Sequence, residues 1–322
     1  MDPLGTLIGI MLGIGGACLF NYAPVLKKEA LNTLDELTLK RFGSSIKILI
    51  TSKGWMAGII MSLVGTALFT ISASILGLLT VVPLMSFGVV ILVIYSVKHF
   101  HERLHARDFL GIVFVVSVPV FLALSEIGDV QANIETPAVF IAFLLASIVI
   151  VLVAIIPFLV NFKLGNKRHS GLIYAISSGM TWGVGTFFIQ ATLGLLKNAG
   201  IVSLLNIAQF FSVFMTFNEH VVASIIVGIS GLLIIVMSTF MQQIALQRTK
   251  LAVASPISQT IINIISITGG ITIFGQPIGN PFFYVISFCF AICGTFLLSK
   301  FQKQDQAARA SEIQGTGQTT KT

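Results

Sequence analysis

Charge is what this sequence has least of: Asp, Glu, Lys and Arg make up 10% of its 322 residues, whereas hydrophobic residues make up 55%. A soluble domain carries about 25% charged residues. A water-facing fold of this length could not cover its surface with so few charges. Long apolar runs are abundant instead, and about 20 apolar residues are enough to cross the hydrocarbon core of a bilayer. The composition predicts an all-α, polytopic membrane protein.

Cysteine is also scarce, and Cys18, Cys289 and Cys293 all lie in apolar runs. None has histidine at metal-ligand spacing, and buried thiols are ordinary core residues. Cys289 and Cys293 are one helical turn apart, so we expect a shared packing face rather than a disulfide. The net charge of +7 does not indicate a nucleic-acid partner, because basic residues in membrane proteins first set the topology.

Nine apolar segments are each close to the length of a membrane-spanning helix. The opening MDPLGTLIGI has no basic stretch and no convincing cleavage site, so we expect the first apolar run to remain as a helix. The predicted spans are Leu4–Pro24, Trp55–Ser74, Leu78–Val97, Phe109–Ser125, Pro137–Val160, Gly171–Ala191, His220–Gln243, Leu251–Phe274 and Pro281–Ser299.

Basic residues are distributed very unevenly around these spans. All but one of the 19 Lys and Arg residues fall on one side, the exception being Lys197. By the positive-inside rule that side is cytoplasmic, which places the N-terminus outside and the C-terminus inside, with the plasma membrane as the expected location. Residues 301–322 are polar and are predicted to form a disordered cytoplasmic tail.

A tenth span is an open alternative. The segment AGIVSLLNIAQFFSVFMTF, Ala199–Phe217, is apolar enough to cross the membrane. A span there would move Arg248, Lys250 and the tail to the outside and weaken the charge asymmetry. We therefore expect this segment to lie in the interface or to re-enter the membrane.

Three of the five histidines lie in KHFHERLHARD, residues 98–108. His99, His101 and His105 are spaced almost as metal ligands are, but a metal site needs a ligand set that closes around the ion, and few partners lie nearby. We interpret the stretch as a cytoplasmic loop after the third span, with its basic side chains at the headgroups. A regulatory metal site is the alternative.

Two blocks of the chain resemble each other. LGLLTVVPLMSFG and TKLAVASPISQTI each place a proline early in an apolar helix, Pro83 and Pro256, and a short polar loop and a final helix follow in both. Spans one to four then correspond to spans six to nine, with the fifth unpaired, and an offset of five reverses the direction of every repeated helix. Such inverted repeats are typical of secondary transporters, which place the substrate near the midplane between the repeats.

Glycine-rich helices open both blocks, and small residues let membrane helices approach closely. Gly9 and Gly13 in the first span and Gly179 and Gly183 in the sixth are therefore expected helix contacts. The predicted organisation is a first membrane repeat at 1–125, the linking fifth span with its flanking loops at 126–170, a second membrane repeat at 171–300 and the tail at 301–322.

These elements, in this order, resemble the drug/metabolite transporter superfamily with EamA-type repeats. HERL followed by DFLG is similar to the family pattern GERL followed by WLG, and ALQRTKLAVASPI is similar to the matching element of the second repeat. Nine spans and VLKKEAL after the first helix also resemble the NIPA-type magnesium transporters, whose pattern is KKKGL, although Ala30 replaces its glycine. The resemblance implies alternating access and, from the NIPA-type likeness, transport of Mg²⁺ or another divalent cation.

The predicted spans contain no charge well inside them, which argues against a proton-coupled pump and against bare Mg²⁺ held by carboxylates. On the eighth span Ser255, Gln259 and Asn263 form one polar stripe, which should face a cavity or a partner helix. Hydrogen bonding between helices is the competing explanation for such residues. Further substrate-binding candidates are Gln242, Gln190, Trp182, Asn21 and Tyr22, with Ser62, Thr66, Thr70, Ser238, Gln243 and Ser266 as weaker ones.

Pro83 and Pro256 each remove a backbone hydrogen bond and would loosen their helices. Interrupted helices at matching places in two repeats point to the binding region, and a packing kink is the alternative reading.

The predicted function is a secondary transporter that works by alternating access and carries Mg²⁺ or another divalent cation. The alternatives are import or export of a small organic metabolite or drug, and a scaffold that transports nothing. No span holds paired carboxylates or a Ser/His pair, so we expect neither an enzyme nor a cofactor, and no metal ligands are assigned. The expected partners are the solute and the lipid bilayer, with a homodimer left open and nucleic acid excluded.

Overall fold

The computed structural model describes residues 3–35, 37, 42–76, 84–100, 106–126, 137–164, 170–200, 215, 218–275 and 277–297. Within these ranges the regular elements are helices and no strand is present. Pro83, most of the segment 199–217 and the tail lie outside them, as do His101 and His105. The predictions for these residues therefore stay predictions.

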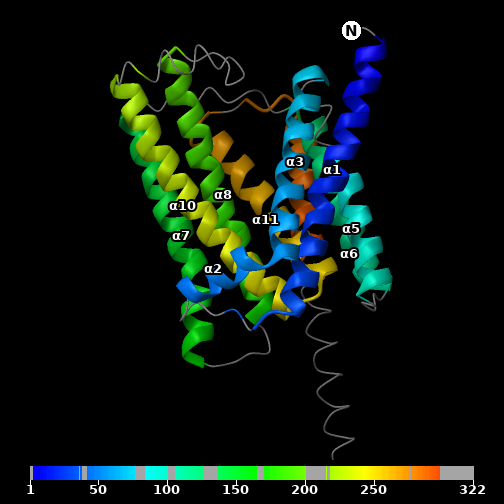
Figure 1. Ribbon diagram of the computed structural model, residues 1–322. Helices are drawn as coiled ribbons and strands as arrows, with labels where there is room; N and C mark the ends of the chain where they lie inside the picture. Colours follow the sequence, from blue (N-terminus) through cyan, green and yellow to red (C-terminus); the bar gives the residue numbers. More distant parts are fainter. Residues whose placement is uncertain are drawn as a thin grey trace, which may run out of the picture.

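A helix lies at each of the nine predicted positions, and a short additional one, α2, follows the first (Figure 1). The helices are α1 (Pro3–Asn32), α2 (Phe42–Thr51), α3 (Lys53–Leu76), α5 (Met85–His99), α6 (Ala106–Leu124), α7 (Pro137–Leu164), α8 (Ser170–Asn198), α10 (Glu219–Arg248), α11 (Leu251–Thr272) and a final helix, Pro281–Leu297. Among the described residues, α1, α3, α8, α10 and α11 are long and apolar enough to cross a membrane.

The outward faces of these helices are apolar. On α10, Ile226, Leu232 and Leu233 are each 60% exposed or more, and α7 and α1 also carry exposed large hydrophobic residues. Exposed apolar surface on this scale marks a membrane or protein contact. With helices of spanning length, it indicates a membrane-embedded protein.

Local signals in the sequence explain where α10 begins and ends. The Asn218 side chain accepts a hydrogen bond from Val221 N at 2.9 Å, which caps the first turn. Glu219 follows in that turn and Arg248 lies in the last one, so each charge is near the helix end whose dipole favours it.

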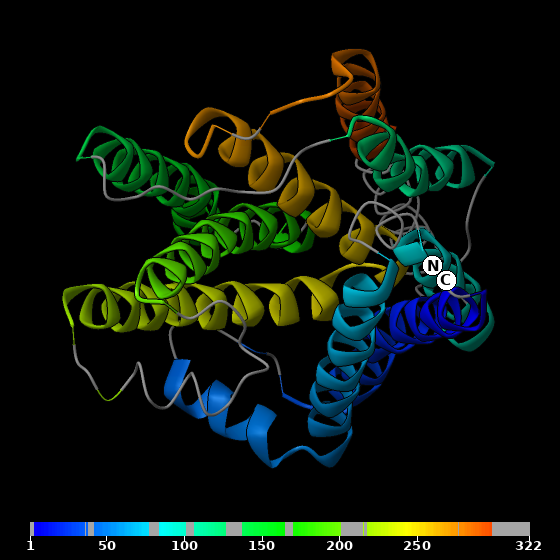
Figure 2. The same cartoon turned by 90° about the horizontal axis from the view of Figure 1, so that it is seen from above.

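Two groups of helices make up the described structure (Figure 2). In the first, α1 packs mainly against α3 and α5, and in the second, α8 packs mainly against α10 and α11, with α7 beside α8. We call these the α1 unit (α1, α3 and α5) and the α8 unit (α8, α10 and α11). Helix α6 contacts the final helix, where Val118 and Leu122 pack around Ala291.

Glycines permit the closest approaches within each unit. Gly9 and Gly13 face α3, where Ser72 Oγ donates to Gly9 O at 2.6 Å. Gly179 and Gly183 instead face α11. Both expected glycine contacts are present. However, the glycines of α1 contact α3, the second helix of their unit, whereas the glycines of α8 contact α11, the third helix of theirs.

Two sequence predictions need correction here. The first helix does not end at Pro24 but runs on to Asn32, because LKKEALN contains good helix formers and no breaker. Lys27, predicted to lie in a loop, is therefore on α1. Cys289 and Cys293 are free but exposed, so among the described residues the face that they share is not packed against another helix.

Candidate functional site

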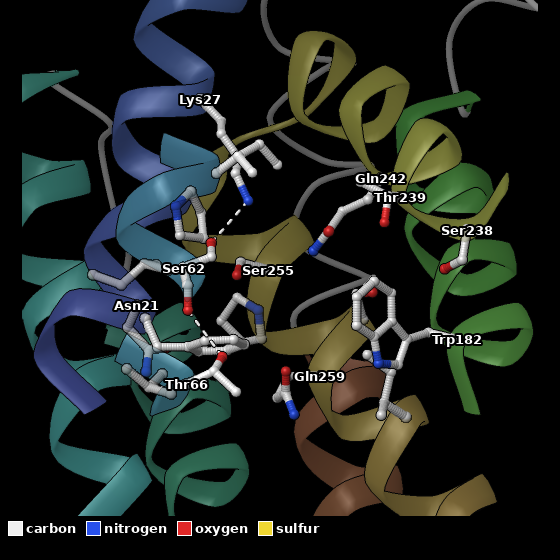
Figure 3. Close-up of a pocket in the computed structure, with 18 of the residues that line it drawn as sticks. Asn21, Lys27, Ser62, Thr66, Trp182, Ser238, Thr239, Gln242, Ser255 and Gln259 are labelled. Carbon is white, nitrogen blue, oxygen red and sulfur yellow. Dashed lines mark hydrogen bonds between the residues drawn. The ribbon is translucent and has the colours of Figure 1, made fainter. Parts of the chain in front are cut away.

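A cavity of about 340 Å³ lies between the α1 unit and the α8 unit. Small-molecule sites span roughly 300–1,000 Å³, so this one is at the lower end. Helices α1, α3 and α5 line it from one side, and α8, α10 and α11 line it from the other. Its polar lining residues are Asn21, Lys27, Ser62, Thr66, Trp182, Ser238, Thr239, Gln242, Ser255, Ser258 and Gln259 (Figure 3).

A second cavity, of about 210 Å³, adjoins the first. Asn21, Pro256 and Gln259 line both cavities, whereas Asn263 lines the second and not the first. The two volumes therefore follow the polar stripe of α11 from Ser255 towards Asn263.

Most of the substrate-binding residues predicted from the sequence meet at this site. Five of the eight line the larger cavity, and a sixth, Asn263, lines only the smaller of the two. Ser62, Thr66, Ser238 and Pro256 also lie in the lining. The residues brought together are Gln259, Ser255, Gln242, Trp182, Asn21 and Asn263.

Tyr22 and Gln190 are absent from the cavity lining given by the described residues. The Tyr22 ring packs edge-on against Tyr95 of α5, with centroids 4.7 Å apart. The Gln190 Oε1 atom is buried with no hydrogen-bond partner among the described residues.

Most of the weaker candidates bond within or between helices. Ser266 Oγ lies 2.7 Å from Thr186 Oγ1, and Ser238 Oγ donates to Ser178 O at 2.6 Å. Within α3, Thr66 Oγ1 donates to Ser62 O and Thr70 Oγ1 donates to Thr66 O, both at 2.9 Å. For these residues the competing explanation, hydrogen bonding that satisfies the helices themselves, describes what the structure shows.

Several polar groups in the cavity are open to a ligand. In the described part of the chain, the side chains of Gln242 and Ser255 have no hydrogen-bond partner, and both face the central space in Figure 3. Gln259 Nε2 reaches Asn263 Oδ1 only at 3.4 Å. Amides with unused donors and acceptors in a concave, largely apolar site are typical of small-molecule recognition.

Lys27 is the charged lining residue that the sequence analysis missed, together with the neutral Thr239 and Ser258. Lys27 was assigned to a loop, whereas its ammonium group lies in the cavity and donates to Ser62 Oγ at 3.0 Å. The sequence after Pro24 favours helix, and this signal could have located Lys27. If α1 continues, Lys27 lies one turn beyond Pro24 on the same face of the helix as Asn21 and Pro24.

One end of the cavity is closed by contacts between the units. Trp55 Nε1 donates to Gln243 Oε1 at 3.1 Å, and Lys28 Nζ donates to Thr249 O at 2.9 Å. Gln247 Nε2 also donates a hydrogen bond to Leu31 O at 3.2 Å. A buried apolar cluster, including Leu31, Leu37, Leu49, Phe240, Met241 and Ile244, surrounds them. We call this region the closed end.

At the closed end, α2 completes the contact. The ring of Phe42, at its start, packs edge-on against Phe240 of α10 with centroids 4.8 Å apart. Figure 1 shows α2 lying across the lower end of α10. The segment after α1 therefore ties the two units together at the same end as the hydrogen bonds.

Histidines and acids do not form a metal site in the described part of the chain, where no group of three such ligands occurs. His99, from the histidine-rich stretch, has Nε2 at 3.7 Å from Glu29 Oε1. That distance makes it a weak surface pair.

Comparison of the chain with protein-family models, with curated proteins and with solved structures found no match. The likeness to drug/metabolite and NIPA-type transporters thus stays a prediction from the sequence patterns.

Proposed function

We propose that this protein is a secondary transporter of the drug/metabolite type that works by alternating access around the larger cavity. The observation that carries the proposal is where the cavity lies. Both units line it, and the contacts of the closed end join the same two units. If the units rock about the cavity, breaking the closed end exposes the same polar groups to the opposite side of the membrane.

Helix packing supports the inverted repeat in this proposal. The first helix of each unit packs mainly against its second and third helices, α1 against α3 and α5 as α8 against α10 and α11. Helix α6 and the final helix take the fourth place, and α7 is the unpaired fifth span. With nine spans and the N-terminus outside, the closed end faces the cytoplasm, which makes this an outward-facing state.

For the substrate, the lining favours an organic solute over a divalent cation. Mg²⁺ is usually held by carboxylates together with its own waters. Among the described residues, no Asp or Glu lines either cavity, and a lysine would repel the ion. Mg²⁺ is therefore the second substrate candidate, supported by the sequence resemblance alone.

Alternating access can be tested without knowing the substrate. In a background with Cys18, Cys289 and Cys293 replaced by serine, Ser255→Cys is labelled with small, membrane-impermeant methanethiosulfonates in sealed right-side-out and inside-out vesicles. We expect labelling from both sides, faster from the outside, because the closed end shields the cytoplasmic entrance. A cross-link between cysteines at Trp55 and Gln243 should abolish labelling from the inside alone.

The matched control is Ile148→Cys, which lies on the outward face of α7 and is 54% exposed. Because this cysteine faces lipid, the reagents should not label it in either vesicle preparation. Labelling of Ser255→Cys from one side only, with no effect of the cross-link, would contradict alternating access and favour a fixed pocket.

A further inference from the structure

We infer that the substrate is a small organic anion and that the Lys27 ammonium binds its carboxylate or phosphate group. This inference rests on the proposed function, since it names what the transporter's cavity takes. It starts from the contrast between two adjacent lysines of α1, one used by the fold and one left facing the cavity.

Lys28 is used by the fold. It is 8% exposed, donates to Thr249 O at 2.9 Å and lies 5.3 Å from the centroid of the Phe100 ring. These contacts hold α1 to the start of α11 and to the end of α5. Its charge is therefore engaged at the closed end and is turned away from the cavity.

Lys27 points the other way. Its ammonium has three N–H donors, and the one partner that it has in the described structure is the neutral Ser62 Oγ. No carboxylate from the described residues lines either cavity. An ionisable group inside a membrane protein is costly and generally has a function and a partner. Here an anion entering the cavity would supply that partner.

The position of Lys27 is built into the packing of α1 on α3. A Cβ added at Gly58 would lie 2.7 Å from Lys27 Cγ and 3.0 Å from Ala23 O. The missing side chain thus leaves a groove on α3 along which the lysine stem runs. The ammonium is directed to Ser62, one turn further along α3 and on the wall of the cavity.

The other residues that line the cavity indicate what the rest of the ligand is like. Gln242, Ser255 and Gln259 offer neutral donors and acceptors opposite Lys27 (Figure 3). Trp182, Pro24 and Pro256 provide apolar walls. Neutral amides and apolar walls suit an organic body, whereas an inorganic ion would leave the apolar surface without a contact.

The charge preference of the cavity can be measured with labelling reagents of opposite charge. Ser255→Cys, in the background without native cysteines, is treated with the anionic sulfonatoethyl and the cationic trimethylammonioethyl methanethiosulfonate. We expect the anionic reagent to be favoured after correction for intrinsic reactivity. Lys27→Gln should lower this preference on the order of ten-fold, because a unit charge within a few ångströms acts strongly where water is partly excluded. Lys27→Arg should retain it.

The control is Lys47→Gln, which removes the same charge from the exposed surface of α2 and should leave the preference unchanged. A folded Lys27→Gln protein with the wild-type preference would overturn the inference, as would a cavity that favours the cation. Because both reagents also report access, labelling of the protein with Lys27 intact from both sides, but without a preference for the anionic reagent, rejects the anion and leaves the transporter in place.

Binding provides the second measurement. Thermal unfolding of the purified wild-type protein is followed with glutarate, glycerol 3-phosphate, dihexanoyl phosphatidylglycerol, glycerol, choline and MgCl₂ at constant ionic strength. Stabilisation by glutarate or glycerol 3-phosphate, lost in Lys27→Gln, supports a soluble anion. Stabilisation by dihexanoyl phosphatidylglycerol alone would indicate that the anion bound by Lys27 is a lipid headgroup. Stabilisation by MgCl₂ alone, or equally by glycerol and choline, overturns the inference.

Discussion

Gly16→Val is expected to destabilise the protein by about 3 kcal/mol, at the upper end of what overpacking costs. At Gly16 the backbones of α1 and α3 meet. A Cβ there would lie 2.8 Å from Gly65 O and 2.8 Å from Phe69 N. Backbone atoms in two packed helices cannot move aside as the end of a side chain can, so the helices must separate and lose their contact.

The neighbouring Gly15 is a close control, because nothing lies within 4 Å of a Cβ built on it. Gly15→Val introduces the same side chain, with the same helix propensity, into open space. We expect a near-wild-type midpoint of thermal unfolding for Gly15→Val, and a lower midpoint and a lower monodisperse yield for Gly16→Val. Equal shifts in the two variants would show that α1 and α3 are not packed as described.

Gln243→Leu is expected to accelerate labelling of Ser255→Cys from the cytoplasmic side about ten-fold. The Gln243 side chain is fully buried, accepts from Trp55 Nε1 and donates to Thr239 O at 3.1 Å. Leucine keeps the apolar volume but leaves the indole N–H without its acceptor, which costs about 1–3 kcal/mol while the closed end stays shut. Opening lets water reach the indole, so the balance shifts towards the inward-facing state.

The adjacent Gln242 is the control for this experiment, because it lines the cavity without joining the two units. Gln242→Leu alters the surroundings of Ser255 but should leave the ratio of inside to outside labelling unchanged. Rates are measured in the same inside-out and right-side-out vesicles. If Gln243→Leu does not change this ratio, the Trp55–Gln243 contact is not part of a gate.

The comparison of Gln259 with Gln190 shows how far sequence reasoning could reach. Ser255, Gln259 and Asn263 recur every four residues on an apolar helix, so they lie on one face of it. That polar face must point towards a cavity or a partner helix. Gln190 follows Ser178, Trp182 and Thr186 at the same four-residue spacing on α8. It nevertheless lies outside the lining of both cavities, so periodicity alone does not decide which part of a polar stripe reaches the site. Tyr22, one residue after the lining residue Asn21, is rotated away on the same helix and packs on Tyr95 instead.

Lys27 illustrates the opposite difficulty. Counting charges places lysines at the membrane surface, and that rule applies to Lys28 and Lys27 alike because they are neighbours in sequence. A helix turns about 100° per residue, so the two side chains leave α1 in different directions. Which one faces Thr249 and which one faces Ser62 depends on where α3, α10 and α11 lie around α1.

The sequence by itself determined the helical, membrane-embedded class and the approximate place of each helix, because long apolar runs and helical periodicity are local properties of the chain. Only the tertiary structure decided which polar residues share a cavity, how far α1 continues, and that a lysine rather than a carboxylate lines the site. Those outcomes depend on contacts between residues more than 30 positions apart, such as Lys27 with Ser62 and Trp55 with Gln243. No local pattern encodes the direction in which one helix packs on another.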